Sequence, residues 1–318
     1  MNAFMSTSTR ARVQQYGSLI VLVVILAIVA IAAPNLLKWR TLNTLLLDNA
    51  PLMLVIIGLT IPILLGCLDL SVAALASLAA ICGAMLSPSL GSLGGVLVVL
   101  GAAGIGALQG YLIGRLQIPS FVMTLSALGI FKGLSLFLTS ANMVGIKPGM
   151  ALYDGLAGRT AGIANTVIVV LLVAAILQFV LRFTTLGRNF YAFGSSELAT
   201  YASGVRRDLV RSIAFATSGA CAALAGLMLI SQTMFANATI ADGMLLPALV
   251  GVVVGGTAIS GGVGSVFSSL IGAIIAILIR VGVTLSGFPP SSQDVAFGMV
   301  ILIAVALTTD RAKIGIVK

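Results

Sequence analysis

Residues 163–181 read IANTVIVVLLVAAILQFVL, a run of nineteen positions without a charged side chain. Only Asn165, Thr166 and Gln178 are polar in it. An α-helix crosses the hydrocarbon core of a bilayer with about 20 predominantly apolar residues, because each residue advances the helix axis by about 1.5 Å. The run therefore predicts a transmembrane helix that lies between Arg159 and Arg182.

The same pattern recurs along the whole chain. Charges, Gly/Pro clusters and polar turns divide the sequence into about ten apolar windows, of which the third, eighth and tenth are short. The windows are Ser18 to Ala33, Asn43 to Cys67, Leu70 to Leu86, Gly91 to Gly114, Ser120 to Thr139, Ile163 to Leu181, Ser212 to Phe235, Met244 to Ile259, Ser265 to Leu285 and Gln293 to Thr308. We therefore predict an all-α integral membrane protein, a polytopic bundle of about ten transmembrane helices that forms a single domain over residues 1–318.

The composition excludes a water-soluble protein. Hydrophobic residues make up 59% of the chain and charged residues 8%, against roughly 25% charged residues in soluble domains. The net charge of +9 does not indicate nucleic-acid binding, because the lysines and arginines are scattered singly between apolar runs. Glycine occurs 36 times, often inside the windows, as in Gly101 to Gly110. Small residues at such positions let helices pack closely where lipid supplies no hydrophobic drive for association.

The basic residues predict the orientation, since cationic loops stay in the cytoplasm. With about ten spans and both termini cytoplasmic, Lys38, Arg40, Lys147 and Arg159 face outward. The other loop and terminal cations then lie inside: Arg10, Arg12, Arg115, Arg182, Arg188, Arg206, Arg207, Arg211, Arg311, Lys313 and Lys318. Two longer loops result, a periplasmic one at about 140–162 and a cytoplasmic one at about 182–211.

The chain shows no signature of its own catalysis. Histidine is absent, which removes the commonest general base, and no CxxC or other metal-ligand spacing occurs, so we expect no metal and no cofactor. The glycine-rich stretch from Gly255 to Ser265 lacks the lysine of a GxxxxGK[ST] phosphate loop, and no such loop occurs elsewhere. We predict a protein that hydrolyses no ATP and is not an enzyme. The stretch, which includes Gly256 and Thr257, is instead expected to form a bent turn with exposed backbone between two short spans.

Few ionisable residues fall inside the windows: Asp69, Lys132 and Arg280, with Asp48 near the start of the second window. A charge at the centre of a membrane costs several kcal/mol, so each is a functional candidate. The alternative is that each forms an internal pair or reaches the membrane surface, since Asp69 lies near the inner end of its span and Arg280 near the outer end.

The cytoplasmic loop contains the sequence of a short amphipathic helix. Ser196 is a suitable N-cap, Glu197 would lie in the positive first turn, and Gly204 would end the helix. We expect Glu197 to lie beside Arg188 and the helix to dock into a groove on another protein.

Four stretches resemble the ribose-type permeases of bacterial ATP-binding cassette importers, a family that also carries other pentoses, hexoses and a furanone-like autoinducer. Gly66 to Val72 (GCLDLSV) is similar to the family's GGIDLSVG, and Ile118 to Leu125 (IPSFVMTL) to P-x-F-(I/V)-x-T-L. The cytoplasmic loop matches T-x-x-G-R-x-x-x-A-x-G-x-N-x-x-A-A-x-x-S-G, and Val254 to Ser265 matches V-I-G-G-T-S-L-x-G-G-x-G-S. Order and spacing agree along nearly the whole chain.

The resemblance implies a permease subunit in the bacterial inner (plasma) membrane that passes a pentose, hexose or related small polyol-like solute. It implies three partners: a cassette ATPase subunit, a periplasmic substrate-binding protein and a second permease copy or paralogue. Arg188, Glu197, Ala199 and Gly204 would then couple to the ATPase. The residues expected around the translocation path are Asp69, Phe121, Thr124, Gly255, Gly256 and Thr257.

Two departures from the family leave alternatives open. The family's acidic E-L-D-A-I-A-A stretch is here Met244 to Val250 without either acid, and its Asn-Gly in the ninth span is replaced around Arg280. The substrate and the choice between a homodimer and a heterodimer therefore stay open. A secondary sugar transporter driven by protons or sodium is one alternative function, and a branched-chain amino acid permease of the same importer class is another.

Overall fold

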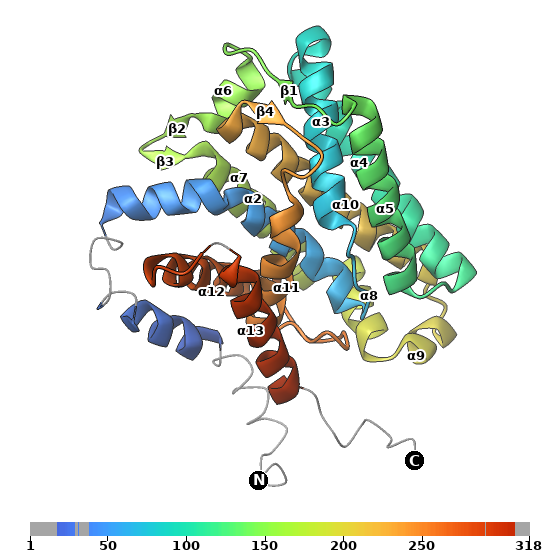
Figure 1. Cartoon of the computed structure of the whole chain (residues 1–318). Coiled ribbons are helices and arrows are strands. Elements are labelled where there is room, and N and C mark those ends of the chain that lie inside the picture. The colour runs from blue at the N-terminus through green and yellow to red at the C-terminus, as the bar shows by residue number, and fades with distance from the viewer. Residues whose placement is uncertain (1–17, 29–30, 32–37, 290, 309–318) are drawn as a thin grey trace.

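The computed structural model describes residues 18–28, 31, 38–289 and 291–308, and these form a bundle of helices with two short strand pairs (Figure 1). Seven of the described helices are long and apolar enough to cross a membrane. They are α2 (Trp39–Leu64), α3 (Val72–Leu90), α4 (Ser92–Leu116), α5 (Ser120–Thr139), α7 (Asn165–Phe183), α10 (Arg207–Thr233) and α12 (Val266–Leu285). The all-α membrane fold expected from the sequence is confirmed.

Shorter elements complete the described chain. Three are apolar: the helix Ser18–Ile28, α11 (Leu245–Val254), which follows the 3-10 turn η2 (Asp242–Met244), and α13 (Ser292–Thr308). The others are α6 (Ala151–Ala157), α8 (Thr185–Ser195), α9 (Glu197–Ala202), and the strands β1 (Val144–Gly145), β2 (Arg159–Thr160), β3 (Ile163–Ala164) and β4 (Phe235–Ala236). Each of the ten expected windows coincides with a long or short apolar helix. The predicted cytoplasmic termini lie outside the described residues.

The third window extends further than the sequence indicates. We expected it to end at Leu86, before the polar Ser87-Pro88-Ser89, but α3 continues to Leu90. The Ser87 hydroxyl donates to the carbonyl oxygen of Gly83 (2.6 Å) and lies 2.7 Å from the Tyr153 hydroxyl. Ser87 is therefore satisfied inside the protein, and the helix does not have to end at the polar cluster.

The centre of the bundle is formed by α2, α3 and α10. In the most apolar stretch of each, 72% of residues are buried, whereas in α5 only 22% are. The outward-facing side chains of α4, α5 and α7 are large and apolar, such as Leu100, Phe137, Leu172 and Phe179. A shell of this kind has lipid, not water, as its solvent.

Glycines bring α4 and α10 into backbone contact. Gly106, Gly110 and Gly114 are spaced four residues apart on α4, and a Cβ added to any of them would collide with the backbone of α10. The atoms met are the carbonyl oxygens of Phe215 and Arg211, and the Cα atom of Asp208. The close packing that the glycine content predicts is thus present between these two helices.

The connections gather at two opposite ends of the bundle (Figure 1). At one end, β1 pairs with β4, and the Asn43 amide at the start of α2 donates to the carbonyl oxygen of Gly162 (2.6 Å). At the other end lie α8 and α9, and the Gly262 amide donates to the carbonyl oxygen of Leu64 at the end of α2 (2.9 Å). The loop cations expected inside and those expected outside fall at different ends.

Candidate functional site

The loop that we expect in the cytoplasm, at about 182–211, folds into two helices, α8 and α9. The Ser196 hydroxyl accepts from the Ala199 amide (3.4 Å), and Gly204 adopts a left-handed φ of +88° just after α9. The short helix with this N-cap and this stop is confirmed. Helix α8 was not expected, although Thr184 caps it and Gly187, Phe190 and Phe193 share its buried face. The spacing of these three residues was an available signal.

The outer side of α9 presents residues to solvent. Ala199 and Gly204 are exposed, and so is Arg188 on α8. Leu198 on α9, a large apolar side chain, is 79% exposed. Arg188, Ala199, Gly204 and the apolar Leu198 are thus all accessible on α8, α9 and the turn that follows them.

Glu197 faces inward, toward α10. Its Oε2 accepts from Arg211 Nη2 at 2.8 Å, and its Oε1 lies 3.8 Å from Arg207 Nη1. The Arg207 guanidinium also stacks over the Tyr201 ring, 3.8 Å from its centroid. We expected Glu197 beside Arg188, but its ion pairs are formed with Arg207 and Arg211 of α10. The reason is that α9 folds back against the start of that helix.

A pocket of about 530 Å³ opens beside this ion pair. Its lining joins α9 and the start of α10 to the α2–α3 and α4–α5 connections: Gly66, Cys67, Ile113, Gln117, Ile118, Pro119, Ser120, Phe121, Glu197, Leu198, Arg207 and Arg211. Phe121 is 51% exposed here. The pocket therefore brings together Phe121 and Glu197, two residues expected in different roles.

Asp69 is sealed in the interior between α2 and α3. It is 2% exposed, and its carboxylate accepts from the Ser71 amide (3.0 Å), the Ser71 hydroxyl (2.7 Å) and the Ser218 hydroxyl of α10 (2.6 Å). Thr124 is also fully buried, with its hydroxyl donating to the carbonyl oxygen of Ser120 (2.9 Å). Both side chains hold helices and connections together.

The glycine-rich stretch after α11 forms a bent turn, as expected. Gly256, Gly261 and Gly262 all have positive φ angles, at +96°, +84° and +77°. Gly255 packs under the backbone of α12, and the Thr257 hydroxyl lies 3.3 Å from that of Ser269. Because a Cβ at Gly194 would meet both Leu64 and Gly262, the turn packs directly against α8 and the end of α2.

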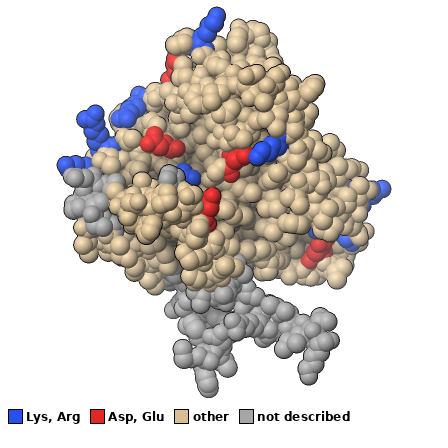
Figure 2. Space-filling model, in the orientation of Figure 1, with Lys and Arg blue, Asp and Glu red and all other residues tan. Residues whose placement is uncertain are grey.

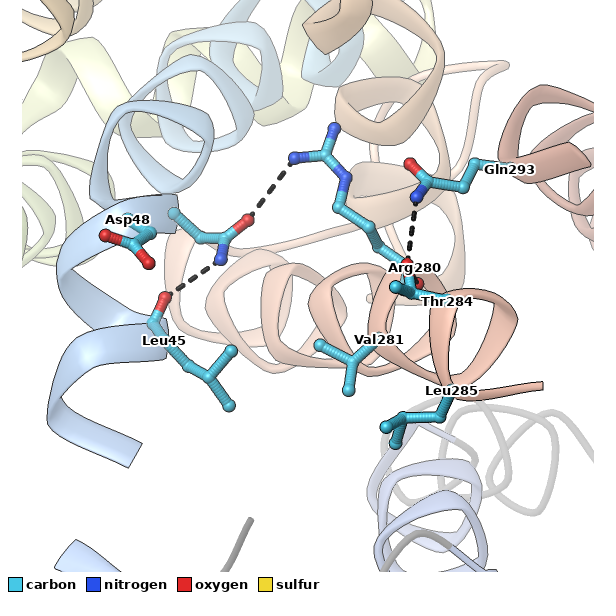
Figure 3. Close-up of a pocket in the computed structure, with 8 residues that line it drawn as sticks. Leu45, Asp48, Arg280, Val281, Thr284, Leu285 and Gln293 are labelled. Carbon is cyan, nitrogen blue, oxygen red and sulfur yellow. Dashed lines mark hydrogen bonds between the residues drawn. The ribbon is translucent and has the colours of Figure 1, made fainter. Parts of the chain in front are cut away.

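A second pocket, of about 340 Å³, lies between the first half of α2, the end of α12 and the start of α13 (Figure 3). It is lined by Leu45, Asp48, Asn49, Arg280, Val281, Thr284, Leu285 and Gln293. Arg280 Nη1 donates to Asn49 Oδ1 (3.4 Å), and its Nη2 donates to the Gly243 carbonyl (3.3 Å). Two of the four ionisable residues singled out from the sequence, Asp48 and Arg280, thus share one pocket.

Lys132 forms an internal ion pair, which is one of the two arrangements expected for it; the other was a side chain that reaches the membrane surface. Its Nζ lies 2.6 Å from Asp242 Oδ2 of η2, with both side chains partly exposed. Since Arg280 bonds to Gly243, the neighbour of Asp242, the two cations converge on η2 from α5 and α12. Sequence reasoning missed Asp242 as a partner because it lies 110 residues away along the chain.

Known proteins match the chain over nearly its full length. The family described as branched-chain amino acid transport system / permease component matches residues 41–305. The ribose import permease protein of Escherichia coli is 31% identical over 311 residues, which cover 95% of this chain and 96% of the relative. That of Bacillus subtilis is 34% identical over 305 residues, 94% of each chain.

A third relative has another sugar in its name. The D-allose transport system permease protein of Escherichia coli is 31% identical over 300 residues, covering 92% of this chain and 91% of the relative. No solved structure matches the chain. The resemblance seen in the sequence motifs is confirmed, and the chain belongs to the branched-chain amino acid transport system / permease component family as a multi-pass inner-membrane protein.

Proposed function

We propose that this chain is the permease subunit of an ATP-driven importer for a monosaccharide or a related small polyol. The observation that carries the proposal is the likeness to ribose and D-allose permeases over at least 92% of the chain. The family description mentions amino acids, but these relatives have sugars in their names, which favours a sugar over a branched-chain amino acid.

The buried acid argues against transport driven by a proton or sodium gradient. Such a carrier needs carboxylates that exchange ions with water inside the spans. Asp69 is sealed from solvent and hydrogen bonded by Ser71 and Ser218. Asp48 lies in the outer pocket, toward the end of the bundle that carries β1 and β4. An energy source outside this chain fits these positions better.

The energy source we infer is a separate cassette ATPase that docks on α8 and α9. The sequence contains no GxxxxGK[ST] phosphate loop. The exposed Leu198, set among Arg188, Ala199 and Gly204, supports a protein contact at this surface, since an apolar side chain that is 79% exposed gains from burial against a partner. Glu197 would transmit the motion of α9 to α10 through Arg211.

The remaining partners are a periplasmic binding protein and a second permease copy or paralogue. The binding protein would dock at the outer end, on the 140–162 loop. The inference of a second permease rests on charged side chains at the surface of this chain. Figure 2 shows a small group of them in the middle of a face that is otherwise largely uncharged. Lys132 lies within the span α5, and its side chain and that of its partner Asp242 are 43% and 37% exposed. A charge that faces lipid at the centre of a span costs roughly 2.5–3.5 kcal/mol. A water-filled path shared with a second copy removes that cost.

The other expected residues would act by shaping this path. Phe121 lines the inner pocket and would contact solute leaving toward the cytoplasm. Asp69 and Thr124 would fix the connections beside that pocket. Gly255, Gly256 and Thr257 would hold the turn that packs against α8, so that a movement of the coupling helices reaches α11 and α12.

Uptake of radiolabelled ribose, allose and leucine tests the proposal. The chain is produced with its cognate ATPase and binding protein in cells that lack other routes for these solutes. We expect uptake of a sugar that requires the binding protein, stops when the phosphate-loop lysine of the ATPase is replaced, and persists when the proton gradient is collapsed at constant ATP. Uptake of leucine alone would contradict the substrate class, and loss of uptake with the proton gradient would contradict the energy source.

A further inference from the structure

The structure assigns the outer pocket, with Arg280 at its centre, as a binding site for a neutral polyhydroxylated solute on its way through the permease. This inference rests on the proposed function and deepens it, because it locates a contact point for the substrate within the permease itself. The pocket lies between the start of α2 and the end of α12 (Figure 3), and Arg280 bonds to Gly243 of η2. Under the proposed function, this is the end at which solute enters from the binding protein.

Arg280 has unused hydrogen-bonding capacity. A guanidinium has five N–H donors, yet the bonds that Arg280 makes to described residues are two long ones, of 3.4 and 3.3 Å, both to neutral acceptors. Its Nε is buried and has no hydrogen-bond partner within that part of the chain. Among the described residues, no carboxylate lies within ion-pair distance of Arg280, whereas Lys132, Arg206, Arg207 and Arg211 all have one. A half-buried arginine in this condition gains from additional oxygen acceptors.

The space beside Arg280 suits a small solute. The pocket volume of about 340 Å³ falls within the roughly 300–1,000 Å³ that small-molecule sites occupy. Leu45, Val281 and Leu285 give it apolar walls, which match the C–H faces of a sugar ring. The polar side chains run from Asp48 through Arg280 to Gln293 across the same pocket, so one solute can contact both kinds of surface (Figure 3).

The polar groups match adjacent hydroxyls. The Asp48 carboxylate accepts hydrogen bonds, the Arg280 guanidinium donates them, and the Asn49 and Gln293 amides and the Thr284 hydroxyl can do both. The Gln293 amide already donates to Thr284 Oγ1 (3.2 Å), which holds its carbonyl oxygen and second N–H free within the described surroundings. Each sugar hydroxyl is both a donor and an acceptor. A lining that contains donors and acceptors therefore satisfies several neighbouring hydroxyls better than a lining of donors alone or acceptors alone.

The charge of the pocket favours a neutral ligand. Arg280 and Asp48 are the two charged side chains of the lining, and their charges cancel. A sugar acid would meet the Asp48 carboxylate, and a simple amine would meet the guanidinium. A zwitterionic amino acid could pair with both charges, but it would offer no hydroxyl to the Gln293 carbonyl oxygen, whereas Asn49 and Thr284 are already bonded to Leu45 and Arg280.

Two variants of the pocket and one matched control test the site. Arg280→Gln removes the charge and most donors while keeping a long polar side chain, and Gln293→Ala truncates a half-buried residue with little risk to folding. Arg40→Gln makes the same change as the first variant at an exposed arginine at the start of α2, outside the pocket lining. Ligand-observed NMR of the full-length chain in nanodiscs, without the binding protein, measures contact with ribose, allose, ribonate and leucine.

We expect saturation transfer to ribose or allose in the wild type and in Arg40→Gln. The affinity for the sugar should be about tenfold weaker in both pocket variants. Ribonate and leucine should show no saturation transfer. In the importing cells the same two variants should raise the KM for sugar uptake by a similar factor. Sugar uptake that is unaffected by both variants overturns the site and leaves the proposed function intact. Preferential binding of leucine or ribonate overturns the neutral-polyol assignment. Absence of any sugar uptake by the wild type contradicts the proposed function itself.

Discussion

The Glu197 carboxylate accepts a 2.8 Å hydrogen bond from the Arg211 guanidinium, which fastens the first turn of α9 to the second turn of α10. Helix α10 runs from there through the centre of the bundle, and its Ser218 hydroxyl holds the buried Asp69 at 2.6 Å. Helix α10 therefore connects α9 to the connection between α2 and α3. Movement of α9 has a direct physical route into the membrane core.

Reversing the charge at Glu197 should uncouple transport without unfolding the protein. Glu197→Lys places a third cation beside Arg207 and Arg211, so α9 should separate from α10. Because the Glu197 side chain is 38% exposed, the pair contributes only about 0.2–1 kcal/mol to folding, and abundance in the membrane should stay near normal. Uptake should fall by more than about tenfold, since a like charge at a contact costs several kcal/mol.

The charge swap separates two explanations of that loss. If the ion pair to α10 matters, Glu197→Arg combined with Arg211→Glu should recover part of the uptake and of the substrate-stimulated ATP hydrolysis. Failure of the swap, together with failure of Glu197→Gln, would assign the carboxylate to a direct contact with the ATPase. Full activity of Glu197→Lys alone would refute any coupling role for this residue.

Substitutions at Gly204 should rank by their tolerance of a left-handed backbone. Gly204 ends α9 with φ at +88° and has open space around it, so conformation and not crowding limits the residue. Gly204→Asn should retain most uptake, Gly204→Ala less, and Gly204→Val least, with a strain of about 1–2 kcal/mol for a residue with a Cβ. Uptake assays at matched expression check the order. Equal activity of the Asn and Val variants would contradict it.

Replacing a glycine of α4 by alanine should destabilise the bundle at Gly110 but not at Gly104. A Cβ at Gly110 would collide with the Arg211 carbonyl, whereas nothing lies within 4 Å of a Cβ at Gly104. We expect Gly110→Ala to cost about 1–3 kcal/mol, because the α4–α10 contact must open. Gly104→Ala should be neutral or slightly stabilising through helix propensity. Thermal unfolding in detergent compares them, and equal melting temperatures would contradict the packing.

The sequence was sufficient to predict those features of the fold that depend on residues close together along the chain. Apolar run length predicts the spans, because the bilayer thickness sets the length of each helix. Ser196 and Gly204 predict both ends of α9, since a cap and a stop act within one helical turn. The aromatic spacing of Phe190 and Phe193 could have revealed α8 as well.

The contacts between distant segments could not be predicted in this way. The Ser218 bond to Asp69 joins residues 149 positions apart, and the Arg280 bond to Asn49 spans 231 positions. Windows of apolar residues specify which segments enter the membrane but not how the helices rotate about their axes. That rotation decides that Asp69 is sealed and that Arg280 faces a pocket.

Neutralising Asp69 should separate a structural role from a proton-carrying one. In Asp69→Asn, one oxygen can still accept from the Ser71 amide and hydroxyl, and the Ser218 hydroxyl can turn to accept from the new amide group. We therefore expect the variant to keep most of its stability and uptake. Asp69→Ala instead leaves the Ser71 amide and the Ser218 hydroxyl without this partner in the interior, at a cost of about 1–3 kcal/mol. Its abundance and melting temperature should fall together with uptake. Normal stability but complete loss of uptake in Asp69→Asn would mean that the carboxylate itself must change charge during transport, as a gradient-driven carrier requires.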